Sequence, residues 1–452
     1  MDVKGQVLLI NPWIYDFAAH NLWIEPLGLL TIAAALRNEG YGVTVIDCLA
    51  PFPGAPRPRS DGSGKFLKTA VDRPEPIAHI PRRYGRYGLP LDAFQAAMRS
   101  APTPDLVLVA SGMTYWYPGV IEAIRQVRST LGSVPVVLGG VYATLCVDHA
   151  QDKSGADAVI SGPGLIAVLR LAAQVTGHEF RMDRYADPSA WPAPTHDPGS
   201  PTSFRRRFAG VLSAWGCPYR CTYCASHRLQ PAFVQREPVA VIDEIMDCLR
   251  HGVRDFAFYD DALLLNAESH LVPILEGVLS RGTLARFHSP NGLHARKISA
   301  ALAALLRRAG FASVRLSLET VNTTRQRTTG GKVTTGAFEE AIRHLKKAGF
   351  GVHELGAYIL AGLPGQPLSE VEATIRAVHA LGVQARLALY SPIPGTPDGD
   401  ASLAPETDPL LHNNTVYPYL QGNDYVNELQ RLKILANEGN RVLATGGLPD
   451  YH

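Results

Sequence analysis

With 452 residues, of which 46% are hydrophobic and 19% charged, the chain is long enough for two or three domains with ample hydrophobic core. Its formal net charge of +2 and the absence of a dense Lys/Arg block argue against a nucleic-acid-binding protein. No apolar run reaches membrane-spanning length and no leader-like stretch follows a charged N-terminus, so the sequence predicts a cytoplasmic enzyme without membrane contact.

The first part of the chain alternates short apolar segments with amphipathic ones. Strands are predicted at residues 6–10, 43–46, 105–110, 134–138 and 156–160. Helices are predicted after Pro26 and around residues 120–127, whereas the Pro/Gly/Arg-rich stretch at 51–90 is predicted to be an insertion or extended loop. This alternation predicts an α/β fold with a doubly wound parallel sheet over residues 1–175, whose ligand would lie at the carboxyl ends of the strands.

Residues 176–204 are rich in Pro, Asp and Ser and are predicted to form a linker. A second series of strands alternating with helices begins at Phe208. Its strands are predicted at residues 209–214, 253–259, near 287, 313–318, 352–360 and 385–390. About six strand–helix units over residues 205–400 are too few for a closed eight-stranded barrel. The tail, residues 401–452, holds one predicted helix at 426–438.

Three cysteines, Cys217, Cys221 and Cys224, follow the first strand of this second series with the spacing C-x3-C-x2-C. A 4Fe–4S cluster needs four ligands, so three protein thiolates would leave one iron open to a substrate or cosubstrate. A structural zinc site would need a fourth ligand. His227 is the local candidate, but C-x3-C-x2-C-x2-H is not a usual zinc spacing. The remaining alternative is an accidental cluster of cysteines.

This loop, with the aromatic Tyr223 directly before the last cysteine, resembles the cluster-binding loop of the radical S-adenosylmethionine (radical SAM) enzymes. In that family the open iron chelates the amino and carboxylate groups of S-adenosylmethionine, and cleavage of the sulfonium gives methionine and a 5′-deoxyadenosyl radical. The resemblance implies a partial (β/α)6 barrel, a 4Fe–4S cluster, S-adenosylmethionine as cosubstrate, and an electron donor such as flavodoxin or ferredoxin.

Further motifs at predicted strand ends resemble the same family. Asp260 and Asp261 end the second barrel strand, where relatives bind the amino group of S-adenosylmethionine, and carboxylates pair well with an ammonium. A solvated acidic loop or a helix N-cap is the alternative. Ser317 and Glu319 end the fourth strand, and the resemblance places them near the ribose and the methionine carboxylate of the cosubstrate.

Two more features of the second half are carried over from the resemblance. Arg325 or Arg327 would supply the cationic partner of the cosubstrate carboxylate. The turn that contains Gly362 and Pro364 ends the fifth strand and resembles the family's Gly-Leu-Pro-Gly turn. Relatives often follow this turn with Glu, whereas this chain has Gln366.

The N-terminal half resembles the cobalamin-binding domain of the cobalamin-dependent subfamily. The resemblance places twelve residues around the corrin and its nucleotide tail: Asn11, Pro12, Ser111, Met113, Thr114, Gly139, Gly140, Val141, Tyr142, Ala143, Gly162 and Gly164. The Asp-x-His-x-x-Gly loop that supplies a histidine to cobalt is absent, and the spacing of His20 from Asp16 is wrong for it. The sequence therefore predicts cobalamin without a histidine ligand, or else a vestigial sheet that holds no cofactor.

His288, His294 and Tyr390 follow barrel strands and are candidates for catalysis, positioning or the core. The leading hypothesis is a cobalamin-dependent radical SAM enzyme that methylates an unactivated carbon, or phosphorus, of a small molecule or peptide. The alternatives are a radical SAM cyclase or rearrangement enzyme without methyl transfer, and a non-catalytic cobalamin- or cluster-binding regulator. A tRNA methylthiotransferase would need further cluster cysteines and a basic RNA-binding domain, and neither is evident.

Overall fold

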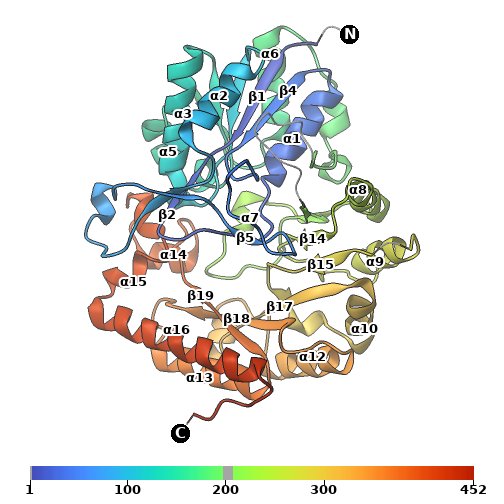
Figure 1. Ribbon diagram of the computed structural model, residues 1–452, viewed down its shortest axis with the longest axis vertical. Helices are drawn as coiled ribbons and strands as arrows, with labels where there is room; N and C mark the ends of the chain where they lie inside the picture. Colours follow the sequence, from blue (N-terminus) through green and yellow to red (C-terminus); the bar gives the residue numbers. More distant parts are fainter. Residues whose placement is uncertain (1–2, 197–206, 283, 452) are drawn as a thin grey trace.

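The computed structural model describes residues 3–196, 207–282 and 284–451, and Figure 1 shows an N-terminal sheet above a second, larger sheet. The N-terminal sheet is parallel throughout, with the strand order β10-β9-β8-β1-β4. Its strands are β1 (Gln6–Asn11), β4 (Gly42–Asp47), β8 (Leu106–Val109), β9 (Val136–Leu138) and β10 (Ala158–Val159). This is the doubly wound sheet that the sequence predicts.

Helices cover both faces of this sheet because its strands alternate apolar side chains between two hydrophobic clusters. On β1, Leu8 and Ile10 point into one cluster, and Val7 and Leu9 point into the other. A parallel strand buried on both faces needs such a continuous apolar run. The flanking helices are α1 (Leu27–Asn38), α2 (Leu91–Ser100), α3 (Tyr117–Leu131), α4 (Val141–Leu145), α5 (Val147–Lys153) and α6 (Leu165–Thr176), with the 3-10 turn η2 (Thr114–Trp116).

The predicted insertion at 51–90 contains short strands that pair with the segment after β1. β2 (Ile14–Asp16) pairs with β7 (Gly85–Tyr87), which also pairs with β6 (Lys68–Ala70), and β3 (His20–Asn21) pairs with β5 (Gly64–Lys65). The 3-10 turn η1 (Glu75–Ile77) lies between β6 and β7. Strands of two or three residues leave no periodicity to read, so the sequence predicted only an extended loop here.

The second sheet is a partial barrel of six parallel strands in the order β11-β14-β15-β17-β18-β19. The strands are β11 (Phe208–Val211), β14 (Asp255–Phe258), β15 (Arg286–His288), β17 (Phe311–Glu319), β18 (Leu355–Ala361) and β19 (Gln384–Leu389), with β16 (Leu293–His294) pairing with β17 and the hairpin β12 (Ala214–Trp215) and β13 (Val234–Gln235) beside it. The six strand–helix units of the prediction are confirmed.

The outer face of the barrel is apolar and packs against helices, whereas its inner face carries polar side chains. On β17, Val314, Leu316 and Leu318 belong to the large core cluster, so the alternate residues Arg315 and Ser317 face inward. The helices of this half are α7 (Ser226–Leu229), α8 (Pro238–Arg250), α9 (Leu271–Leu279), α10 (Ala300–Ala309), α11 (Thr323–Thr328), α12 (Thr335–Lys347) and α13 (Leu368–Ala380), with the 3-10 turn η5 (Ala295–Lys297).

Trp23, from the N-terminal half, enters the interior of this barrel. Its ring stacks on His288 with centroids 4.0 Å apart and an interplanar angle of 19°, and it clusters with Phe208 and Ala257. Its indole Nε1 donates to the Asp61 carbonyl at 2.6 Å. Trp23 of the N-terminal half therefore packs against β11, β14 and β15 inside the barrel.

The predicted linker is packed as far as the structure describes it. It contains η3 (Met182–Tyr185) and η4 (Pro188–Ala190), and the Tyr185 hydroxyl donates to Glu39 Oε1 at 2.8 Å. His196 lies between the carboxylates of Glu25 (3.0 Å) and Glu244 (2.9 Å), one from each half of the chain. Residues 197–204 lie outside the described residues, and the predicted domain boundaries stay predictions.

The C-terminal segment joins the two halves. His412 Nδ1 lies 3.1 Å from Thr114 Oγ1, and Asn413 Nδ2 donates to Asp16 Oδ1 at 3.0 Å. The segment consists of α14 (Pro397–Ser402), η6 (Pro409–His412), α15 (Tyr417–Leu420) and the long α16 (Asn423–Ala444), which extends the predicted tail helix and packs on α13 and β19 (Figure 1). In the part of the chain described here, no helix is both long and apolar enough to cross a membrane.

Candidate cofactor and substrate site

The three motif cysteines lie on the loop between β12 and α7. Cys217 and Cys221 are buried, Cys224 is half-buried, and all three are free thiols. Burial, with smaller contributions from Asp261, Cys224 and Cys221, raises the pKa of the Cys217 thiol to about 11, so the three thiols lie within electrostatic range of one another. Cys224 Sγ lies 3.1 Å from Ser226 Oγ, and no three His, Cys, Asp or Glu side chains of the described residues are arranged as a metal site.

The donor chemistry of the loop fits an iron–sulfur cluster better than a closed zinc site. Gly330 has φ +123°, and a Cβ there would lie 3.1 Å from Cys221 Cα, so a glycine lets this neighbouring loop come close. Burial, together with Arg220 and Arg228, lowers the pKa of His227, the local candidate for a fourth zinc ligand. Three thiolates without a fourth protein ligand match a cluster with one open iron.

Of the two predicted acidic residues, Asp260 is held by the protein and Asp261 is exposed. Asp260 Oδ1 accepts from the Ser213 hydroxyl at 2.6 Å and Oδ2 from the Ser213 amide at 3.2 Å. Burial raises the pKa of Asp260 to about 6. Asp261 lies within electrostatic range of Cys217. Asp260 therefore positions the strand end before the cluster loop, and Asp261 is the better placed of the two to meet an ammonium.

Glu319 is paired with Lys332, a residue that sequence reasoning missed. Both side chains are nearly buried, with 11% and 13% exposed, and the ammonium also lies 5.6 Å from the centre of the Tyr223 ring. Glu319 has φ +69°, an uncommon conformation for a residue other than glycine. The strained strand end and the ion pair fix this carboxylate beside the cluster loop.

The other residues predicted to bind the cosubstrate are divided. Ser317 is buried on the inner face of β17, close to Gly292. Arg325 is occupied: its Nε donates to Glu370 Oε1 at 2.8 Å and its Nη2 to the Gly365 carbonyl at 2.9 Å. Arg327 is exposed on α11. The guanidinium of Arg325 therefore shapes the turn after β18, which leaves its predicted contact with the cosubstrate carboxylate as a prediction.

Gln366 explains how this chain keeps the turn without the usual Glu. Its Oε1 accepts from the amides of Gly362 (2.9 Å) and Leu363 (3.2 Å), and its Nε2 donates to the Leu360 carbonyl at 3.0 Å. A carboxylate could accept but not donate. The side-chain amide of Gln366 therefore stabilises the turn both as an acceptor and as a donor. Gly362 (φ +103°) takes the left-handed conformation that the turn requires.

The three candidate catalytic residues differ in their surroundings. His288 contacts Asp255 Oδ1 and Ser313 Oγ, each at 3.0 Å, and stacks on Trp23, so it is a positioning residue of the core. His294 is buried edge-on to Tyr219 of the cluster loop, with its pKa lowered to about 4 by burial and nearby lysines. Tyr390 is buried against Tyr417, and burial raises its pKa. His294 is thus neutral at pH 7 and faces the cluster side.

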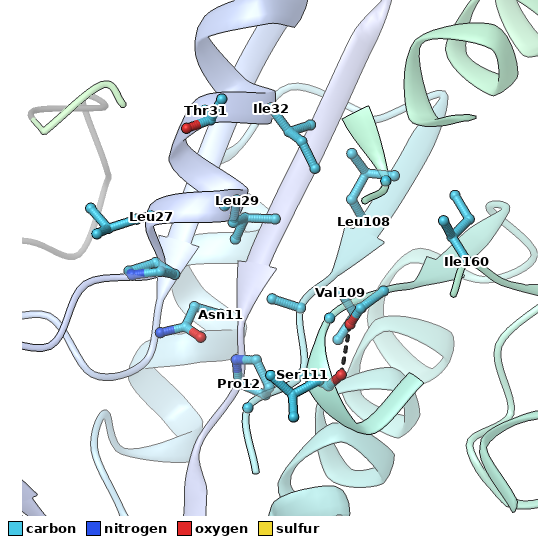
Figure 2. A pocket seen from close by; sticks show the side chains of 18 of the residues that line it. Asn11, Pro12, Leu27, Leu29, Thr31, Ile32, Leu108, Val109, Ser111 and Ile160 are labelled. Carbon is cyan, nitrogen blue, oxygen red and sulfur yellow. Dashed lines mark hydrogen bonds between the residues drawn. The ribbon is translucent and has the colours of Figure 1, made fainter. Parts of the chain in front are cut away.

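A cavity of about 400 Å³ lies at the carboxyl ends of the N-terminal strands. Figure 2 shows the α1 residues Leu29 and Thr31 above Asn11 and Ser111, with Ile160 across from α1. Trp215, two residues before the first motif cysteine, lines the same cavity. The predicted ligand site of the sheet therefore opens toward the cluster loop.

Glycines leave room in this cavity where other residues would fill it. A Cβ on Gly162 would meet nothing within 4 Å, and one on Gly139 would meet only the Ile160 carbonyl, at 3.9 Å. Two polar atoms of cavity-lining residues, Thr31 Oγ1 and Trp215 Nε1, are buried without a hydrogen-bond partner in the described chain. A flat, mostly apolar group with hydrogen-bonding edges, such as a corrin, fits these walls.

Eight of the twelve predicted cobalamin residues line the cavity: Asn11, Pro12, Ser111, Gly139, Gly140, Val141, Gly162 and Gly164. Four do not. Tyr142 and Ala143 are fully buried in the core, Met113 is exposed, and Thr114 contacts His412. The sequence of a short segment after a strand does not show which of its side chains point into the cavity. The prediction therefore includes these four residues together with neighbours that do line it.

Sequence reasoning also missed residues that shape the cavity. Thr144 Oγ1 accepts from the Gly162 amide at 2.9 Å and donates to the Gly140 carbonyl at 2.7 Å, so it ties two strand ends together. Ser111 does the same through the Gly139 carbonyl at 2.7 Å (Figure 2). Trp215 and Gln230 reach the cavity from the other half of the chain, a relationship that no local pattern records.

Residues 214–378 match the family model of the radical SAM superfamily. This segment is a radical SAM domain. The match begins at β12, directly before the cluster loop, and ends within α13, and it confirms the resemblance found in the motifs.

Two relatives extend the likeness into the N-terminal half. An uncharacterized methyltransferase of Pyrococcus horikoshii is 24% identical over 323 residues, which cover 65% of this chain and 68% of the relative. The cytidylyl-2-hydroxyethylphosphonate methyltransferase of Streptomyces wedmorensis is 22% identical over 459 residues, which cover 86% of this chain and 80% of the relative.

Solved structures share the architecture of both halves. The radical S-adenosylmethionine methyltransferase TsrM from Kitasatospora setae aligns with a TM-score of 0.64 at 19% identity, over 87% of this chain and 75% of TsrM. The cobalamin-dependent S-adenosylmethionine radical enzyme OxsB aligns with a TM-score of 0.60 at 15% identity, over 94% of this chain and 56% of OxsB. At these identities the likeness shows the fold, and it confirms the predicted fold class.

Proposed function

We propose that this protein is a cobalamin-dependent radical SAM enzyme that transfers a methyl group to an unactivated carbon, or to phosphorus, of a small molecule or peptide. The observation that carries the proposal is the cavity at the N-terminal strand ends, because Trp215 on β12, directly before the cluster loop, forms part of its wall. Two cofactors that act on one substrate need neighbouring sites, and Trp215 brings the wall of this cavity to within two residues of Cys217.

The bound groups supply the difficult chemistry: the cluster cleaves S-adenosylmethionine to a carbon radical, and cobalamin carries the methyl group. Cys217, Cys221 and Cys224 would hold the cluster, and Asp261 and Glu319 would orient the cosubstrate. The glycine-lined strand ends and Trp215 would hold the corrin. An electron donor such as flavodoxin or ferredoxin would supply the reducing electron.

The relatives support methyl transfer over the other radical reactions. Both relatives named above are methyltransferases by name, and so is TsrM, which was solved with a tryptophan substrate. Anaerobic magnesium-protoporphyrin IX monomethyl ester cyclases also match, one from Rubrivivax gelatinosus at 24% identity over 64% of this chain. A cyclase without methyl transfer is therefore the second candidate.

The decisive experiment uses the protein purified and reconstituted without oxygen, with hydroxocobalamin, S-adenosylmethionine and a reductant. Methyl transfer predicts one bound cobalamin per chain and release of both 5′-deoxyadenosine and S-adenosylhomocysteine, measured by mass spectrometry with methyl-labelled S-adenosylmethionine. Formation of 5′-deoxyadenosine alone would favour the cyclase. A protein that binds no cobalamin would rule out the methyltransferase.

A further inference from the structure

Two arginines face the interior of the barrel on neighbouring strands. The outward residues of β18 and β19, among them Ala357, Ile359 and Ala385, belong to the large core cluster. By strand alternation, Arg386 on β19 faces inward, as Arg315 does on β17. Both guanidiniums therefore lie on the concave face, where a substrate of the barrel would sit.

Glycine at position 356 of β18 brings these two side chains together. A Cβ on Gly356 would lie 3.1 Å from Arg315 Cδ and 3.3 Å from Arg386 Cγ. Gly356 has an ordinary backbone conformation, so no left-handed φ explains its presence. Because Gly356 has no side chain, both arginine side chains can pack against its backbone.

Within the described residues, no carboxylate neutralises these two guanidiniums, since neither Arg315 nor Arg386 forms an ion pair there. Arg315 Nη1 donates to the Glu354 carbonyl at 3.0 Å, and Arg386 Nη2 donates to the amide oxygen of Gln384. Burial and the charge of Arg386 lower the pKa of Arg315 to about 10. Two like charges held together without a counter-ion are unfavourable unless an anion binds between them.

Acidic side chains of the neighbouring strands β17 and β14 are already engaged. Glu319 at the end of β17 is paired with Lys332. Asp255 on β14 is paired with Arg286 at 2.6 Å and with His288 at 3.0 Å. Neither of these carboxylates therefore neutralises the arginine pair.

The strand register places the pair next to the predicted cosubstrate site. Tyr358 on β18 is aligned with Ser317 on one side and with Arg386 on the other. Arg386 is exposed and Arg315 is half-buried, so the site is open to a ligand at that level. Tyr358 Oη is not available as a donor to it, because it donates to the Pro290 carbonyl at 2.7 Å.

We propose that Arg315 and Arg386 bind an anionic group, a carboxylate or a phosphate, of the molecule on which the enzyme acts. The proposal rests on the proposed function, in that the substrate enters the barrel beside the cosubstrate. It narrows the substrate class to acids and phosphorylated compounds. Paired guanidiniums are suited to such groups because each presents a planar set of donors.

Binding of inorganic phosphate and of acetate tests the site without knowledge of the substrate. The reconstituted protein is titrated with each anion against sodium chloride of equal ionic strength, and the melting temperature is recorded. The wild type should show a saturable rise with at least one of the two anions. Arg386→Gln should need about tenfold more anion or more for the same rise, because it removes a charge-assisted partner.

Control variants separate this site from general charge effects and from misfolding. Arg343→Gln removes an exposed arginine from α12 and should behave as the wild type. Arg315→Gln also removes a hydrogen bond to the backbone and could fail to fold. In that case Arg386→Gln, at an exposed position, provides the test. The proposal is overturned if neither anion raises the melting temperature of the wild type. It is also overturned if Arg343→Gln weakens this effect as much as Arg386→Gln does.

A second arm distinguishes the substrate from the cosubstrate, whose own carboxylate is also an anion. The titrations are repeated with saturating S-adenosylmethionine, and the rise should persist. If S-adenosylmethionine abolishes it, and Arg386→Gln weakens binding of S-adenosylmethionine tenfold, the arginines hold the cosubstrate and the proposal is wrong. Cobalamin binding and 5′-deoxyadenosine formation, measured on the same samples, report separately on the proposed function.

Discussion

Lys332 and Glu319 form a nearly buried ion pair at the carboxyl end of β17. The lysine follows two glycines, Gly330 and Gly331, and the first of these packs on Cys221. The pair thus connects the strand end predicted to bind the cosubstrate with the loop that carries the cysteines. The Lys332 ammonium also lies within electrostatic range of the Cys221 and Cys224 thiols, whose charged forms would attract it.

Lys332→Met should destabilise the protein and weaken binding of S-adenosylmethionine. Removing one partner of a buried ion pair leaves the carboxylate of Glu319 unpaired, which costs roughly 3–5 kcal/mol. Melting temperature and equilibrium dialysis with S-adenosylmethionine measure the two effects. Lys347→Met, at an exposed position at the end of α12, is the control. A variant with unchanged affinity would show that Glu319 does not depend on Lys332.

Replacing Cys217, Cys221 and Cys224 together by Ala should remove the iron–sulfur cluster. Each thiolate is expected to bind one iron, so the variant should lose close to four iron atoms per chain, the charge-transfer absorbance and all cleavage of S-adenosylmethionine. Iron analysis and product assays measure this. Cys48→Ala and Cys248→Ala, at buried cysteines elsewhere, should keep the cluster. Full iron content in the triple variant would disprove the assignment.

Asp260→Ala and Asp261→Ala should have different effects. Loss of Asp261 is expected to cost about 1.5–3 kcal/mol of binding to S-adenosylmethionine, since it removes a charge-assisted contact to the ammonium. Loss of Asp260 should lower the melting temperature more, because Ser213 loses both of its bonds to this carboxylate. Calorimetric titration and thermal unfolding separate the two. Unchanged affinity in Asp261→Ala would return that residue to a solvated acidic loop.

Gly139→Leu should weaken cobalamin binding without straining the backbone. Gly139 has no positive φ and faces the cavity, so a leucine side chain would occupy ligand space. Gly336→Leu on α12, where a Cβ meets nothing within 4 Å, is the matched control. Binding of hydroxocobalamin is measured by absorbance after gel filtration. Equal cobalamin content in both variants would place the ligand elsewhere.

The cobalt should carry no histidine nitrogen. His20 is exposed on β3, pairs through its backbone with Lys65, and does not line the cavity. Electron paramagnetic resonance of the cob(II)alamin state should therefore lack nitrogen superhyperfine splitting, and His20→Ala should leave the spectrum unchanged. A split spectrum that His20→Ala removes would contradict this prediction.

His412 should make the protein less stable in mild acid. Burial lowers its pKa to about 4 from 6.5, so the folded protein favours the neutral ring. The stabilisation is complete above pH 6.5 and is lost as the pH falls toward 4, because the unfolded chain takes up the proton first. At about pH 5.5 the loss is about 1.4 kcal/mol. Melting temperatures across this range should fall less steeply for His412→Gln than for the wild type.

The sequence could predict the parts of the fold that repeat, and the site residues that sit on motifs. Six barrel strands and five sheet strands were recognisable because apolar runs of regular spacing encode them. The insertion at 51–90 and the place of Trp23 were not recognisable, because very short strands and a single inserted side chain have no periodicity. Lys332 and Trp215 were missed for a related reason: their importance comes from partners distant in the sequence.

Because Trp23 of the N-terminal half packs inside the barrel, the two halves that the sequence separates are not separate in the structure. A chain shortened to residues 208–451 would expose the ring of His288 and the side chain of Phe208, both of which Trp23 covers. Exchange of N-terminal halves between related enzymes would meet the same obstacle. The segment 12–25 and the strands that pair with it would have to be transferred together with the barrel, because Trp23 packs in its interior.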